Sequence, residues 1–124
     1  MLRNFLLFSA FVWLPYGIAC FLFPGLIGGM NGIEATAGTG LIEFKAIYGG
    51  LQSGMGLLVV WALFNSRMER PALIMLVFLC GPMGFARYVA TDFNVAVSLY
   101  TYFALVLEGA TAFVAFWLLG DAQD

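Results

Sequence analysis

Six residues able to ionise or to form hydrogen bonds stand inside long apolar segments of this chain. They are Glu43, Lys45, Tyr48, Gln52, Arg87 and Glu108. Polar groups are costly in apolar surroundings unless they pair with one another or contact a ligand. Such a set could hold an internal ion pair, bind an anion through its cations, or carry a proton on a carboxyl group. The set therefore marks a polar layer that is the candidate functional site.

Helical spacing places these residues on faces rich in small side chains. The first face comprises Lys45, Gly49, Gln52 and Gly56. The second comprises Cys80, Gly84, Arg87 and Thr91. The third comprises Thr101, Ala104, Glu108, Thr111 and Ala112. Because small or polar stripes on apolar helices normally face other helices, each segment should bring one charged side chain toward its neighbours.

Glycines in the same region predict close packing of helices. Gly50 and Gly54 form a GxxxG pair, and Gly49 and Gly84 lie on the small-residue faces. A glycine lets a second backbone approach closely, so we interpret these four residues as packing positions. The sequence leaves open whether Gly50 and Gly54 pack inside the protein or against a partner.

The level of each charge along its helix decides which side chains can meet. With a rise of about 1.5 Å per residue, Glu43, Lys45 and Arg87 fall within about two turns of one membrane surface. Glu108 lies deeper. Arg87 reaches Glu108 only if the last span begins several residues after position 95, and the sequence does not decide whether it does.

Two interpretations of the shallow charges remain open. In the first, the long side chains of Glu43, Lys45 and Arg87 reach the interface and pair there. In the second, Lys45 and Arg87 bind an anionic group, such as a lipid phosphate or a carboxylate. Tyr48 and Gln52 would then add hydrogen bonds to the same group.

The composition excludes several classes of protein. Hydrophobic residues make up 63% of the 124 residues and charged residues only 10%, against about 25% charged in an average soluble domain. The mean hydropathy of +0.98 indicates a membrane protein. A net charge of −2 without a basic run argues against nucleic acid binding. There is no histidine, and Cys20 and Cys80 lack metal-ligand spacing, so we expect free thiols, no metal and no cofactor.

Four apolar segments are long enough to cross a bilayer. We place them, within a single membrane domain of residues 1–124, at residues 5–23, 42–64, 71–90 and 95–119. A glycine-rich loop is expected at residues 25–41 and a tight turn at 91–94. Short connections favour antiparallel neighbours, so the fold class is an all-α, up-down four-helix transmembrane bundle.

The distribution of arginines predicts the orientation of this bundle. Four spans place both termini on the same side. Arg3, Arg67 and Arg70 then share that side, whereas the loop 25–41 and the turn 91–94 contain no Lys or Arg. Because cytoplasmic connections are enriched in Lys and Arg, we predict an N-in, C-in topology.

Three parts of the sequence resemble a known family. The Glu-x-Lys-Ala-x-Tyr-Gly-Gly segment at 43–50, the Gly-x-x-Arg at 84–87, and Glu108 in the last span resemble the bacterial DUF4345 family. Its members are small four-span membrane proteins of unknown function, and the resemblance covers nearly the whole chain. It implies the same fold in a multi-pass protein of the bacterial inner membrane. The family usually has Arg where this chain has Lys45, which keeps the charge but loses the bidentate fork.

These observations favour a non-catalytic protein that binds a lipid or a hydrophobic small molecule, or that serves as an accessory subunit of a membrane complex. Its partners would be the lipid bilayer, such a ligand, another membrane protein or a second copy. A proton-coupled transporter of small molecules, with a relay formed by Glu108, Lys45 and Arg87, is the first alternative. The second is an intramembrane enzyme using Glu108 or Tyr48. No convincing pair of nucleophile and base is present, so we assign no catalytic residue.

Overall fold

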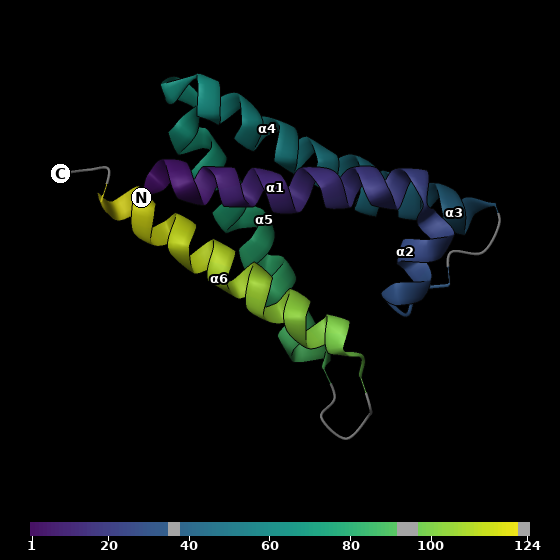
Figure 1. The fold of residues 1–124 in the computed structure, drawn as a ribbon. Coiled ribbons are helices and arrows are strands. Elements are labelled where there is room, and N and C mark those ends of the chain that lie inside the picture. Colours follow the sequence, from purple (N-terminus) through teal and green to yellow (C-terminus); the bar gives the residue numbers. More distant parts are fainter. Residues whose placement is uncertain (35–37, 92–96, 122–124) are drawn as a thin grey trace. The chain divides into compact units, whose positions relative to one another are not determined.

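The computed structural model describes residues 1–34, 38–91 and 97–121, and all regular structure in these ranges is helical (Figure 1). The chain forms two compact units, Met1–Met68 and Glu69–Asp124. Four helical stretches are long and apolar enough to cross a membrane, namely Leu2–Leu22, Thr39–Phe64, Ser66–Ala90 and Leu99–Asp121. The predicted all-α helix-bundle class is therefore confirmed, and these helices indicate a multi-pass membrane protein. The N-in, C-in orientation stays a prediction.

The first unit begins with helix α1, Leu2–Leu22, and continues into shorter segments. These are α2 (Pro24–Met30), α3 (Thr39–Phe44), the π-helix η1 (Lys45–Leu51), α4 (Gln52–Phe64) and the 3₁₀-helix η2 (Ser66–Met68). The expected loop of residues 25–41 is wrong in part, because α2 occupies its beginning. Pro24 stands in the first turn of α2, where its fixed φ suits a helix start and its missing N–H is not needed.

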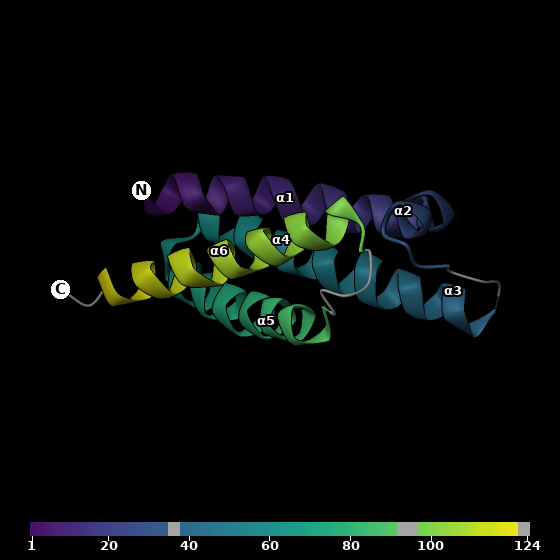
Figure 2. The ribbon, with the colours of Figure 1, turned by 90° about the horizontal axis from the view of Figure 1, so that it is seen from below.

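Close approach of backbones holds α1 against η1 and α4. A Cβ added to Gly56 would lie 2.5 Å from Cβ of Leu14, and one added to Gly49 would lie 2.9 Å from Cβ of Phe21. As residue numbers rise along α1 from Leu14 to Phe21, the contacted glycines of the second span fall from Gly56 to Gly49. The two spans are therefore antiparallel. Both views show α1 alongside α4 (Figure 1, Figure 2). Small residues therefore bring these helices close enough to pack by van der Waals contact.

The second unit is an antiparallel pair of helices, α5 (Glu69–Ala90) and α6 (Leu99–Asp121). A Cβ on Gly84 would lie 3.4 Å from Cβ of Glu108, and one on Gly81 would lie 3.7 Å from Cβ of Ala112. Pro82 lies inside α5, which continues through it. Gly81 and Gly84 thus face α6. This packing sets the level at which side chains of α5 meet those of α6.

The start of α6 differs from the expected span of residues 95–119. Residues 97 and 98 are not helical, and α6 begins at Leu99. The expected turn at 91–94 falls, apart from Thr91, outside the described residues. Since a helix rises about 1.5 Å per residue, the later start brings Glu108 nearer to the beginning of its helix than the sequence suggested.

Candidate functional site

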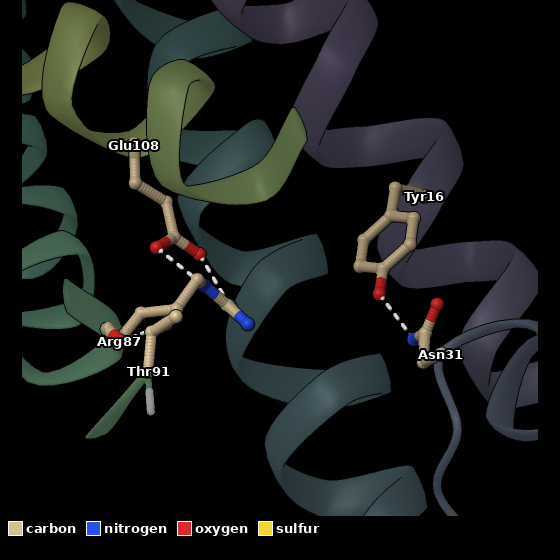
Figure 3. A network of polar contacts seen from close by, with 5 residues as sticks. All are labelled: Tyr16, Asn31, Arg87, Thr91 and Glu108. Carbon is tan, nitrogen blue, oxygen red and sulfur yellow. Dashed lines mark hydrogen bonds and ion pairs between the residues drawn. The ribbon is translucent and has the colours of Figure 1, made fainter. Parts of the chain in front are cut away.

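Arg87 and Glu108 form a two-bonded ion pair across the α5–α6 contact (Figure 3). Nε of Arg87 donates to Oε2 of Glu108 at 3.0 Å, and Nη2 donates to Oε1 at 2.7 Å. The Glu108 side chain is only 6% exposed, against 26% for Arg87. Two parallel charge-assisted bonds of this kind are among the strongest and most directional contacts between side chains.

Local packing explains why the pair can form. Gly84 stands one turn before Arg87 on α5 and leaves room for the Glu108 backbone and Cβ. The late start of α6 places Glu108 level with the end of α5. The sequence made this pairing conditional on a late start, and the structure satisfies that condition.

Two further residues, Thr91 after α5 and Tyr100 of α6, also contact Arg87. The hydroxyl of Thr91 donates to the backbone carbonyl of Arg87 at 2.7 Å (Figure 3). The ring centroid of Tyr100 lies 5.9 Å from Cζ of Arg87, within the range of a cation–π contact. Arg87 is therefore held by groups of its own unit, and its charge is balanced by Glu108.

Lys45 has a different environment in the first unit. Its Nζ lies 5.3 Å from the centroid of the Phe21 ring, and the residue is half-buried. Across residues 1–34, 38–91 and 97–121, no carboxylate forms an ion pair with it. An aromatic face gives an ammonium only about 0.5 to 2 kcal/mol, so the Lys45 charge is not balanced by the protein in this part of the chain.

The segment that carries Lys45 is a π-helix, Lys45–Leu51. Tyr48 lies within it, and its ring stacks on Phe44 with centroids 4.8 Å apart and planes at 17°. Gly49 packs against Phe21 of α1. Short π-helical segments within transmembrane and soluble helices often occur at functional sites, because they redirect side chains and loosen backbone hydrogen bonds.

Gln52, the first residue of α4, carries a buried acceptor without a partner. The residue is 8% exposed, and its Oε1 has no hydrogen-bond partner in the described chain. Ser9 Oγ and Trp13 Nε1 of α1 share this property. A buried polar atom without a hydrogen bond is rare and needs an explanation, such as a water molecule or a ligand.

The remaining predicted site residues lie as follows. Glu43 is exposed in α3, while Gly49 and Gly84 are buried at helix contacts. Gly50 and Gly54 are exposed, and a Cβ on Gly54 would meet nothing within 4 Å. The GxxxG pair therefore does not pack inside its own unit. Packing of this pair against a partner stays a prediction.

Two contacts were not visible in the sequence. Nδ2 of Asn31 donates to the hydroxyl of Tyr16 at 2.7 Å, which ties the end of α2 to α1 (Figure 3). Phe21 faces Lys45. Neither contact has a sequence signal, because the partners are far apart in the chain and aromatic residues are abundant throughout it.

The described surfaces also include an open apolar hollow on α6. It has a volume of about 540 Å³ and is lined by Leu99, Tyr100, Tyr102, Phe103 and Val106. No group of three potential metal ligands lies together in the described ranges.

Comparison with known proteins agrees with the resemblance noted in the sequence. The family described as "Domain of unknown function (DUF4345)" matches residues 1–119. No curated protein and no solved structure matches the chain. The match includes all the residues of the candidate site, from the Lys45 segment to Glu108. The chain therefore belongs to the DUF4345 family.

Proposed function

We propose that this chain is a non-catalytic protein of the bacterial cytoplasmic membrane that binds an amphipathic molecule through an anionic group at Lys45. The observation that supports this proposal is the contrast between two cations. Arg87 donates through Nε and Nη2 to both oxygens of Glu108, whereas among the described residues Lys45 has an aromatic ring and no ion pair with an acid. An unbalanced ammonium among apolar helices attracts a negative group from its surroundings.

The apolar environment favours a lipid as the source of that anion. Lys45 extends from a span that is long and apolar enough to cross a membrane, and Phe21 beside it presents a hydrophobic surface. A molecule with an anionic head and an apolar tail satisfies both features, while a small inorganic anion satisfies only the charge. A Lys at this position can bind a phosphate, because a single ammonium acts on it as a point charge.

The alternatives use Glu108 and receive less support. A proton-coupled transporter needs this carboxylate to gain and lose a proton, and an enzyme needs it to reach a substrate. Both its oxygens already accept hydrogen bonds from Arg87, and the side chain is 6% exposed. The role of accessory subunit stays compatible with lipid binding, because Gly50 and Gly54 are exposed on another face.

Native mass spectrometry of the protein in mild detergent tests the proposal. We expect wild-type protein to retain an added anionic phospholipid and to bind a zwitterionic one at least about tenfold more weakly, as one charge-assisted contact implies. Lys45→Gln should lose this preference, and Lys45→Arg should keep it. Arg70→Gln, which removes the same charge at an exposed position, is the control. Equal lipid retention by wild-type protein and Lys45→Gln would rule out the proposal.

A further inference from the structure

Within the first unit, Lys45 and Gln52 indicate a ligand that carries more than a negative charge. Lys45 supplies a cation, and Gln52 supplies a carbonyl oxygen that is buried and accepts no hydrogen bond from the described residues. A carbonyl oxygen cannot bind an anion directly, because both repel. It needs a donor, an O–H or an N–H.

The two groups lie along the same seam between the second span and α1. Phe21 lies at the level of Lys45 and Gly49, and Gly17 one turn earlier in α1 approaches the backbone of Gln52 and Ser53. Helical side chains lean toward the N-terminus of their helix, so the Gln52 side chain leans back toward Gly49. Seven positions separate Lys45 from Gln52, and the long Lys45 side chain brings its ammonium to 5.3 Å from the centroid of the Phe21 ring in the same seam.

We infer that Lys45 and Gln52 select an anionic phospholipid whose headgroup carries a free hydroxyl, a phosphodiester of a polyol. This inference rests on the proposed function and deepens it by naming the headgroup. The phosphate accepts a hydrogen bond from the Lys45 ammonium, and the hydroxyl donates to Oε1 of Gln52. One molecule then provides a partner for Lys45 and for Gln52.

Other common headgroups satisfy only part of this arrangement. A quaternary ammonium headgroup has no donor for Gln52 and brings a positive charge toward Lys45. A primary ammonium headgroup has donors, but it too places a second cation beside the first. A phosphomonoester supplies the charge without a hydroxyl several bonds away. The polyol phosphodiester therefore fits the two groups best.

Two anionic lipids with the same acyl chains separate the contributions of charge and hydroxyl. Phosphatidylglycerol carries the phosphodiester and free hydroxyls, and phosphatidylmethanol carries the same charge with a methyl group in their place. Native mass spectrometry with both lipids in competition measures the preference directly. We expect wild-type protein to favour phosphatidylglycerol about fivefold, the effect of one hydrogen bond to a buried acceptor.

Variants assign that preference to Gln52. Gln52→Met keeps the length of the side chain but removes the acceptor, so it should bind both anionic lipids equally and still prefer them to phosphatidylcholine. Ser53→Ala removes a neighbouring hydroxyl and should behave as wild type. Lys45→Gln should lose the preference for either anionic lipid over phosphatidylcholine.

The outcomes distinguish this inference from the proposed function. If wild-type protein binds the two anionic lipids equally but favours both over phosphatidylcholine, the hydroxyl inference is wrong and the proposed function stands. If wild-type protein shows no preference for anionic lipids at all, both are wrong. The comparison of lipids uses wild-type protein, so it does not depend on whether a variant folds.

Discussion

Two cations within the long helices illustrate how surroundings decide the role of a residue. Arg87 lies against Glu108, Thr91 and Tyr100, and Nε and Nη2 of its guanidinium both donate to the Glu108 carboxylate. Lys45 has the Phe21 ring beside its ammonium and forms no ion pair within the described residues. A satisfied buried pair stabilises one arrangement of two helices, whereas an unsatisfied charge is available to a ligand. Two residues of the same charge thus have different surroundings in the two units.

Removing one partner of the Arg87–Glu108 pair should destabilise the protein strongly. Arg87→Met leaves Glu108 buried without a cation, and loss of one partner of a buried pair costs about 3 to 5 kcal/mol. Thermal unfolding in detergent measures the effect. The double variant Arg87→Met with Glu108→Leu replaces both groups by apolar ones, so it should lose less stability than the two single variants added together. Strict additivity would mean that the pair contributes no coupling.

At the level of single residues, the sequence predicted which side chains matter but not how they pair. All six polar residues could be recognised in the sequence because charged and hydrogen-bonding side chains are rare in apolar segments. The pairing of Arg87 with Glu108 depends on where α6 begins, and an error of one turn moves a side chain by about 5.4 Å. The orphaned acceptor of Gln52 was not visible either, since it depends on what α1 places beside it.

At the level of elements, the π-helix Lys45–Leu51 changes which glycines pack. The sequence treated the whole second span as a regular α-helix and assigned packing to Gly49, Gly50, Gly54 and Gly84. In the structure Gly49 and Gly56 contact α1, and Gly50 and Gly54 are exposed. A π-helical turn contains more residues than an α-helical one, so faces counted at spacings of three and four do not continue through it.

Substitutions at two glycines of α4, one packed against α1 and one exposed, test this arrangement. Gly56→Ala adds a Cβ within 2.5 Å of the Leu14 backbone and side chain, and overpacking of this kind costs about 1 to 3 kcal/mol. Gly54→Ala meets nothing within 4 Å and should gain helix propensity instead. The melting temperature in detergent should fall for Gly56→Ala and stay or rise for Gly54→Ala. A fall for Gly54→Ala alone would reverse the assignment of the two faces.

At the level of the whole molecule, the length and apolarity of the spans determined most of what the sequence could predict. Segments of about twenty mostly apolar residues leave few alternatives to membrane-spanning helices. The number of such helices and the all-α class were therefore accessible without coordinates. Helix α2 was not, because a short segment with several glycines lacks the long periodic pattern that makes a helix recognisable.

Orientation in the membrane is the property of the whole molecule that most needs a measurement. The N-in, C-in prediction places Arg67, exposed in η2, in the cytoplasm and Glu34, exposed after α2, outside. A membrane-impermeant maleimide added to intact cells should therefore label Glu34→Cys and should label Arg67→Cys only after permeabilisation. Cys20 and Cys80 are free but buried, so wild-type protein provides the background. The opposite labelling pattern would invert the topology and place Lys45 near the cytoplasmic leaflet, from which its anionic ligand would then come.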